Sequence, residues 1–425
     1  MENQALLAIG IFIITYGFII SERIHRTIVA MLGGGCMVLF GIVGQETALE
    51  HIDFNTLGLL IGMMIIVSIT AETGVFKYVA IWSAKKVNGK PLAILLALSM
   101  ITAISSAFLD NVTTVLLMVP ITFSITRQLN LSPMPFLISE ILLSNIGGTA
   151  TMIGDPPNIM IGSAVHSLTF GAFIANLAPV IVVIIIVTLL ILVGIYRKQL
   201  RVDDRVRQRI MELNEKDEIS NPRLMVKSLI ILFLTIIGFF LHQLIGIESA
   251  TVALIGAFLL LLLSGERYVE KSLAKVEWTT IFFFAGLFVL VSGLEETGVI
   301  KQVATYAIHL TGGNETATAF LVLWLSAIAS AFVDNIPFVA TMIPLIKDMG
   351  GMGISHLEPL WWSLSLGACL GGNGTLIGAS ANLIVAGLAG KEGYKISFKH
   401  YFLIGFPLML VSILISMAYI YVRYL

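Results

Sequence analysis

Long apolar segments separated by short polar ones run along almost the whole chain. A helix that crosses a bilayer core about 30 Å thick needs roughly 20 apolar residues, and eight uninterrupted segments approach that length. These segments are residues 4–20, 27–44, 55–71, 172–196, 228–244, 251–264, 278–294 and 400–422. The pattern therefore predicts an all-α polytopic membrane protein.

Four further apolar segments are interrupted by Gly, Pro, Asp and Asn. They are residues 92–126, 136–165, 316–346 and 360–389. Backbone can leave the helix at membrane depth only where protein or a watery cavity satisfies its polar groups. We therefore predict re-entrant hairpins at 92–126 and 316–346 and broken helices at 136–165 and 360–389, and we expect a functional site among them.

Composition supports a membrane protein and excludes several other classes. Of 425 residues, 57% are hydrophobic and 12% are charged, whereas an average soluble domain carries about 25% charged residues. The net charge of −1 leaves no basic excess to neutralise phosphates, so no nucleic-acid partner is expected. The first apolar segment follows Glu2 rather than a basic region, which indicates a retained span and not a signal peptide.

The distribution of basic residues predicts an orientation. Nine of the 25 Lys and Arg residues lie in the segment 197–227, whereas the loop 45–53 has none. Cytoplasmic loops carry the excess of Lys and Arg, so we expect 197–227 to be a cytoplasmic linker in a plasma (inner) membrane protein. With five crossings on each side of the linker, both termini would lie outside.

The chain contains an internal repeat with a constant offset of 224 residues. Glu72-Thr73-Gly74-Val75 recurs at 296–299, and the motif at 106–111 recurs at 330–335. We therefore predict repeat one at 1–196 and repeat two at 228–425. Because each repeat would have an odd number of crossings, the second copy must be inverted relative to the first. Inverted repeats with paired broken helices indicate a secondary transporter with its site near the membrane midplane.

The hairpin turns carry the first candidate site residues. A carboxylate at the membrane centre costs about 2.5–3.5 kcal/mol on insertion scales, so it needs a cation, a proton or backbone N–H partners. The two turns supply Ser106, Asp110 and Asn111, and Ser330, Asp334 and Asn335. The simpler interpretation is that the two Asp residues only cap the helices that follow them.

The two broken helices carry the second set of candidates. Unwound carbonyls together with Thr and Asn oxygens suit a hard monovalent cation such as Na⁺. The residues are Asn145, Thr149, Thr151, Asp155 and Asn158 in the first copy, and Asn373, Thr375 and Asn382 in the second. A packing kink without a ligand is the alternative interpretation of these breaks.

The two copies differ at acidic positions. Asp155 corresponds to Ala379, and Glu140 corresponds to Leu364. Asp155 is a candidate for coupling or for substrate discrimination, although it could instead cap the helix after it. Glu140 could equally be a buried, protonated structural group.

No Lys or Arg occurs in either broken helix, or in either hairpin up to Pro120 and Pro344. We therefore expect a site without fixed positive charge, which favours cation exchange, a neutral solute, or an anion carried with a cation. No nucleotide-binding, metal-ligand or nucleophile motif is present, so we expect no enzyme activity and no cofactor, with Na⁺ or H⁺ as the coupling ion.

The motifs at 106–114, 154–158, 330–338 and 371–382 resemble those of the ion transporter superfamily. The most similar branch is the arsenite/Na⁺:H⁺ permease group (ArsB/NhaD), and within it the pink-eyed-dilution P proteins. The resemblance implies the fold of the divalent anion:sodium symporters and a homodimer. It also implies one ion site at Ser106, Asp110, Asn111, Thr149 and Thr151, and a mirror site at Ser330, Asp334, Asn335, Asn373 and Thr375.

We therefore predict a secondary active transporter that moves a small inorganic solute, arsenite-like or Na⁺/H⁺, by alternating access. Na⁺ would bind at Asp110, Asn111 and Thr149, and at Asp334, Asn335 and Asn373. One alternative is a chloride channel or transporter similar to the P protein. Another is a Na⁺-coupled dicarboxylate symporter, for which Ser144-Asn145-Ile146 is a partial match to the Ser-Asn-Thr signature.

Overall fold

The computed structural model describes residues 2–21, 23–354 and 356–425, and every regular element in these ranges is a helix. In this part of the chain, eight helices are long and apolar enough to cross a membrane, and three shorter helices are also apolar. The predicted all-α membrane fold is therefore confirmed.

The helices of the first half and the linker follow the predicted segments closely. They are α1 (Glu2–Ser21), α2 (Arg26–Leu39), α3 (Gln45–Glu50), α4 (Phe54–Glu72), α5 (Val75–Lys86), α6 (Pro91–Leu109), α7 (Asn111–Gln128), α8 (Met134–Gly148), α9 (Pro156–Ala164), α10 (Phe170–Tyr196) and, in the linker, α11 (Asp204–Met211) and η1 (Glu215–Glu218).

The second half repeats this order of elements. Its helices are α12 (Pro222–Leu241), α13 (Ser249–Ser264), α14 (Arg267–Leu273), α15 (Trp278–Glu296), α16 (Val299–Thr311), α17 (Glu315–Phe332), α18 (Asn335–Gly351), α19 (Glu358–Gly371), α20 (Ser380–Lys391) and α21 (Phe398–Tyr424). Each helix from α15 to α20 begins 224 residues after its counterpart in α4 to α9. The repeat seen in the sequence is thus a repeat of structure.

Two predicted spans have shifted ends. Helix α2 stops at Leu39 rather than at residue 44, because the chain turns at Gly41, whose φ is +66°. Helix α12 begins at Pro222, six residues before the predicted span at 228. The Asn221 side chain caps it by accepting a hydrogen bond from the Leu224 N–H at 3.1 Å, and proline suits the first helical position.

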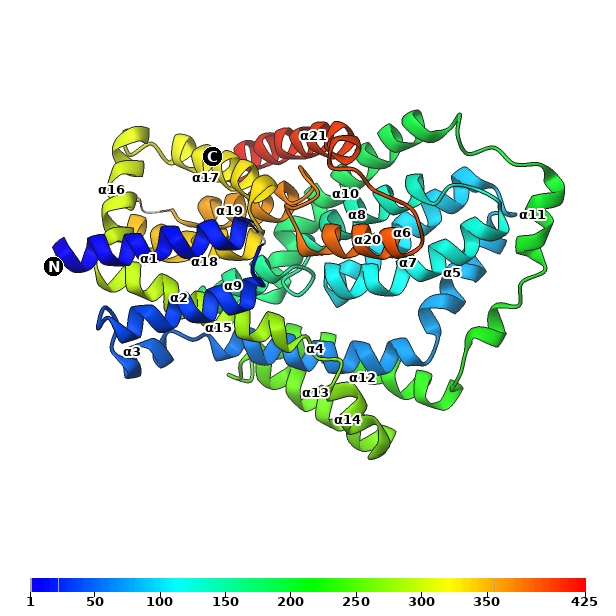
Figure 1. Ribbon diagram of the computed structural model, residues 1–425, viewed down its shortest axis with the longest axis horizontal. Helices are drawn as coiled ribbons and strands as arrows, with labels where there is room; N and C mark the ends of the chain where they lie inside the picture. The colour runs from blue at the N-terminus through cyan, green and yellow to red at the C-terminus, as the bar shows by residue number, and fades with distance from the viewer. Residues whose placement is uncertain (1, 22, 355) are drawn as a thin grey trace.

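The two hairpins point into the molecule from opposite ends. Figure 1 shows α6 and α7 in the right half and α18 in the left half, with α5 and α16 at the corresponding outer positions. The turns of both hairpins lie near the middle of the molecule. This arrangement is the inverted repeat that the odd number of crossings predicts.

The halves are intertwined as well as inverted, because α2 packs along α15 and α4 packs along α13. Glycines allow these backbones to approach closely. A Cβ on Gly286 would lie 2.6 Å from the carbonyl carbon of Ala30, and one on Gly62 would lie 2.6 Å from that of Ala253. Small residues are the usual means by which helices pack tightly within a membrane.

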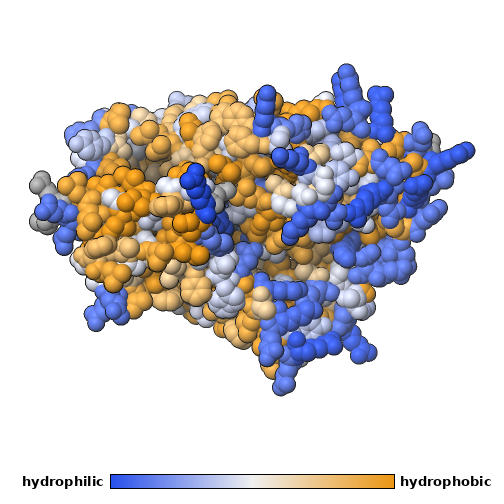
Figure 2. All heavy atoms as spheres, in the orientation of Figure 1, coloured by the Kyte–Doolittle hydropathy of each residue, from blue (hydrophilic) through white to orange (hydrophobic). Residues whose placement is uncertain are grey.

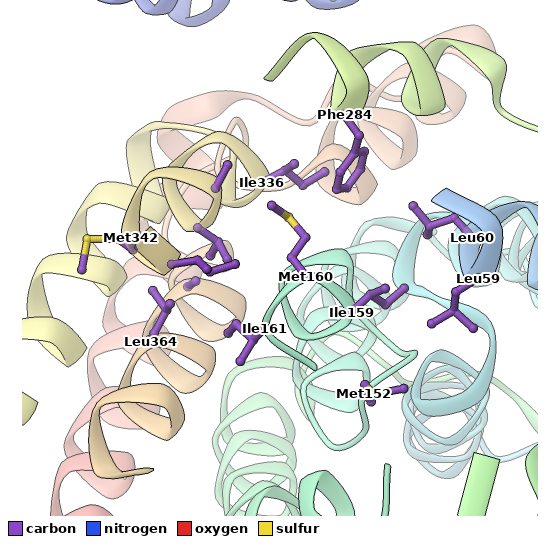
Figure 3. Close-up of a cluster of buried hydrophobic side chains, with 14 of the residues drawn as sticks. Leu59, Leu60, Met152, Ile159, Met160, Ile161, Phe284, Ile336, Met342 and Leu364 are labelled. Atoms are coloured by element: carbon purple, nitrogen blue, oxygen red, sulfur yellow. The ribbon is translucent and has the colours of Figure 1, made fainter. Parts of the chain in front are cut away.

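Buried apolar side chains from both halves meet around the central helices. Figure 3 shows Leu60 of α4 and Met160 of α9 facing Phe284 of α15 and Ile336 of α18. The outer surface is also apolar: Leu39, Leu244 and Val422 are each 84% exposed. Figure 2 shows hydrophilic residues concentrated at the right end, where Figure 1 places α11. Lipid contact accounts for an apolar surface of this extent.

An ion pair attaches the linker to the first half. Lys85 Nζ lies 2.6 Å from a carboxylate oxygen of Glu215 and also donates to the Leu213 carbonyl at 2.8 Å. The hydrogen bond from Lys85 lowers the pKa of Glu215 below its usual value of 4.5. The attachment is therefore present at pH 7 and is lost as the pH falls through that lowered pKa.

We expect Lys85→Gln to increase the rate of trypsin cleavage within 197–227 several-fold at pH 7, because the linker opens more often. The neighbouring Lys86→Gln variant is the control, and it should leave the rate unchanged. Once the pH is below the lowered pKa of Glu215, pepsin should cleave the wild-type linker as fast as that of Lys85→Gln. Equal rates for wild type and Lys85→Gln at pH 7 would show that the ion pair does not hold the linker.

Candidate functional site

The hairpin turns are built differently, although their sequences match. Asp110 joins α6 to α7 with φ +80° and ψ 156°, a region that non-glycine residues rarely adopt, whereas Asp334 has φ −49°. The Asp110 carboxylate accepts hydrogen bonds from Thr113, from N–H at 2.8 Å and from the hydroxyl at 2.7 Å. Asp334 accepts from the Ile336 N–H at 3.1 Å. Both Asp residues therefore cap a helix.

Hydroxyl groups fix the breaks of α8–α9 and α19–α20 to the hairpins. Ser106 donates to the Ser144 carbonyl at 2.6 Å, and its counterpart Ser330 donates to the Ala368 carbonyl at 2.6 Å. In the same matched way, Thr151 donates to the carbonyl of Ala107, and Thr375 donates to that of Ala331. The pairing holds each unwound segment against the hairpin of its own half.

Asparagines connect the two halves through a buried network. Asn145 donates to Asn373 Oδ1 and to Asn382 Oδ1, both at 2.9 Å, and accepts from Asn111 at 3.1 Å. Asn158 accepts from the Ser365 hydroxyl at 2.6 Å. Because these groups satisfy one another, the network fixes the relative position of the halves in this conformation.

Thr149 lies beside this network. Its hydroxyl donates to the Asn145 carbonyl at 2.7 Å, and its own carbonyl accepts from Asn158 Nδ2 at 3.1 Å. Thr149 is fully buried and does not line the cavity described below.

Asp155 lies at the interface between the halves and accepts a single, long hydrogen bond. It is fully buried and precedes α9, yet its side chain makes no capping hydrogen bond. Asn335 of the other half donates to its Oδ1 at 3.4 Å, and the Cys369 thiol lies beside the carboxylate. Its Oδ2 accepts no well-formed hydrogen bond in the described part of the chain. A buried carboxylate oxygen without a partner is costly, which marks a place for a cation or a proton.

A cavity of about 40 Å³ lies between the hairpin turns. Four of the predicted residues line it, namely Asp110, Asn111, Asp155 and Asn335. This volume accommodates only a few water molecules or one small ion. The other predicted residues do not line it, and among them Asp334 lines a neighbouring pocket of about 280 Å³.

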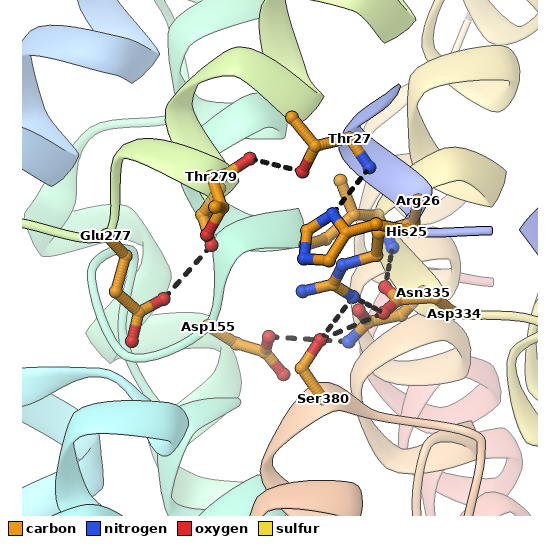
Figure 4. A network of polar contacts seen from close by, with 11 residues as sticks. His25, Arg26, Thr27, Asp155, Glu277, Thr279, Asp334, Asn335 and Ser380 are labelled. Atoms are coloured by element: carbon orange, nitrogen blue, oxygen red, sulfur yellow. Dashed lines mark hydrogen bonds and ion pairs between the residues drawn. The ribbon is translucent and has the colours of Figure 1, made fainter. Parts of the chain in front are cut away.

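Two charged residues at this cavity were not predicted. Arg26 comes from the start of α2, and Glu277 precedes α15. Arg26 Nη1 lies 2.5 Å from Asp334 Oδ2 and 2.7 Å from the Ser380 hydroxyl. Figure 4 shows Arg26 reaching toward Asp334, with Asp155 and Asn335 close by.

The expectation of a site without fixed positive charge is therefore wrong. That expectation rested on the hairpins and the broken helices alone, whereas Arg26 is the first residue of α2 and lies outside those segments. Glu277 corresponds to Asp53 in the repeat, and both residues directly precede a span, outside the hairpins and the broken helices.

Glu140, the second acidic difference between the copies, and the buried Cys369 both lie outside the cavity lining. Glu140 is fully buried, and its Oε1 accepts a hydrogen bond from Thr122 of α7. Its Oε2 also has no hydrogen-bond partner in the described residues, but unlike Asp155 it does not line the cavity. Cys369 is also buried and contacts Asn158 at 3.5 Å. Within the described residues, no group of three His, Cys, Asp or Glu side chains is placed to hold a metal ion.

Paired inverted hairpins and broken helices around a small charged cavity define a secondary transporter. The sequence pattern of the citrate transporter (CitMHS) family matches residues 16–367. The chain belongs to this family, within the ion transporter superfamily that its motifs resemble. It is therefore a transporter and not an enzyme.

Two relatives and one solved structure are similar to this chain. An uncharacterized transporter of Mycobacterium tuberculosis (strain ATCC 25618 / H37Rv) is 42% identical over 429 residues, which cover 99% of each chain. The P protein of Homo sapiens is 35% identical over 507 residues, which cover 100% of this chain and 60% of the P protein. The YdaH transporter of Alcanivorax borkumensis has a crystal structure that is described as revealing an unusual topology. This structure aligns with the chain at a TM-score of 0.59 and 14% identity, over 99% of this chain and 98% of YdaH. That structural likeness shows a shared fold.

Proposed function

We propose that this protein is a cation-coupled, alternating-access transporter in which Asp110 and Asp155 bind the coupling Na⁺ or H⁺. The main support is that the fully buried Asp155, whose Oδ2 accepts no hydrogen bond in the described residues, lines the same cavity as Asp110. Burying a carboxylate without a counter-ion is expensive, so these acids require a cation or a proton whenever the cavity is closed.

Charge and size favour a small inorganic solute. Asp110, Asp155 and Glu277 line the cavity, and its one cationic side chain in the described chain, Arg26, is already paired with Asp334. A bare anion would therefore be repelled. A volume of about 40 Å³ also excludes a tricarboxylate in this conformation. Arsenite, which is a neutral acid at pH 7, or exchange of Na⁺ for H⁺ satisfies both constraints.

Citrate is the second candidate solute, on the basis of the family's description. A carboxylate would need Arg26 to leave Asp334, because a guanidinium is the side chain best matched to a carboxylate. We further propose a homodimer in the plasma membrane, with the linker 197–227 cytoplasmic and both termini outside.

Flux into proteoliposomes identifies the solute. Purified protein is reconstituted, and uptake of arsenite, Na⁺, chloride and citrate is measured under imposed Na⁺ or proton gradients. We expect arsenite or Na⁺ flux that follows one of the cation gradients. Citrate uptake that requires a cation gradient would select the second candidate. Chloride flux that ignores both gradients would indicate a channel and overturn the proposal.

A further inference from the structure

The two hairpin turns are equivalent in sequence but differ in charge balance. Asp334 is paired with Arg26 and also accepts from the Ser380 hydroxyl at 2.9 Å. At the other turn, Pro156 stands where the repeat would place Ser380, and Ala250 stands where it would place Arg26. Within the described chain, Asp110 has no ion pair with a basic side chain.

Arg26 is held at this position by contacts from the second half. Its guanidinium lies over the Phe283 ring at 5.0 Å from the centroid, and the adjacent Thr27 hydroxyl donates to the Thr279 carbonyl at 2.7 Å. A cation at the first residue of a helix opposes the helix dipole, so Arg26 does not serve the stability of α2. Its position is explained by the acid that it contacts.

The pair also lies against the proposed cation site. Arg26 and Ser380 line the cavity of Asp110 and Asp155, while the Asp334 side chain is only 12% exposed. The guanidinium thus occupies the position at the second turn that a mobile cation would take if the two ion sites were symmetric. Neutralisation by a tethered cation makes a second mobile cation unnecessary.

We infer that Arg26 is a tethered cation that fills the second ion site, so that each transport cycle carries one coupling cation, bound at Asp110 and Asp155, instead of two. This inference rests on the proposed function and deepens it. It replaces the symmetric pair of Na⁺ sites that the repeat suggests with one exchangeable site and one permanently occupied site.

The number of coupling cations tests the inference. Uptake in proteoliposomes is measured against the concentration of the driving cation, and the cation-to-solute ratio is taken from the reversal potential. We expect a Hill coefficient of about 1 in wild type and Arg26→Lys, and about 2 in Arg26→Gln, because the freed Asp334 then takes up a second cation. The matched control is the double variant Arg26→Gln/Asp334→Asn, which lacks both charges. Its Hill coefficient should return to about 1.

Two results would overturn the inference. One is a ratio of two cations in wild type, which decides the question even if the Arg26→Gln protein does not fold. The other is an unchanged ratio in an Arg26→Gln protein that still transports. Both are distinct from failure of the proposed function, in which no cation gradient drives flux in wild type.

Discussion

Asp155→Asn should abolish coupled transport while leaving the protein folded. The side chain makes no capping hydrogen bond, and an amide of the same size keeps an oxygen for Asn335 and a place beside the Cys369 thiol, so the substitution removes charge while these contacts can remain. Two unit charges about 4 Å apart interact by about 4 kcal/mol at an effective dielectric constant of 20. We therefore expect cation binding to weaken roughly 100- to 1000-fold.

The measurement is the dependence of uptake on the driving cation in proteoliposomes, with thermal unfolding in detergent as the check on folding. Glu140→Gln is the matched control. Glu140 is equally buried but does not line the cavity, so this variant should transport as wild type does. If Asp155→Asn transports with wild-type cation dependence, Asp155 is not part of the coupling site.

Gly147→Ala should prevent correct assembly of the first half. A Cβ at this position would lie 2.5 Å from the Cα of Ala103, and backbone atoms of α6 cannot move aside as a side chain can. Overpacking of this kind costs about 1–3 kcal/mol or more. We expect a large loss of monodisperse protein and a thermal transition several degrees lower.

The counterpart Gly371→Ala should behave in the same way, because its Cβ would lie 2.5 Å from the Ala327 carbonyl oxygen. Gly194→Ala in α10 is the control, since a Cβ there meets no atom within 4 Å. Normal yield and stability of Gly147→Ala would contradict the close packing of α6 against α8.

Local sequence signals were sufficient to predict the architecture. Glycine, proline and buried polar residues interrupt helices by local chemistry, and the constant offset of 224 residues extended each assignment from one half to the other. The break at Asp110 and the start of α9 at Pro156 fall where these residues predicted them. Asp110, Asn111, Asp155 and Asn335 were predicted site residues, and they line one cavity.

Contacts between distant segments could not be predicted in the same way. Arg26 meets Asp334 across 308 positions of sequence, and Asn145 meets Asn373 across 228. Such pairs depend on how the two halves dock, which the local pattern of residues does not determine. The cavity volume likewise depends on the final side-chain packing.

A cation gradient, acting through Asp110 and Asp155, should drive solute movement. The most direct measurement is accumulation of the solute identified by flux, starting from equal concentrations on both sides of the proteoliposome membrane, under an imposed Na⁺ or proton gradient alone. We expect transient accumulation that an ionophore for that cation abolishes and that Asp155→Asn lacks. Equilibration without accumulation, at a rate that the ionophore does not change, would show that no cation gradient drives transport.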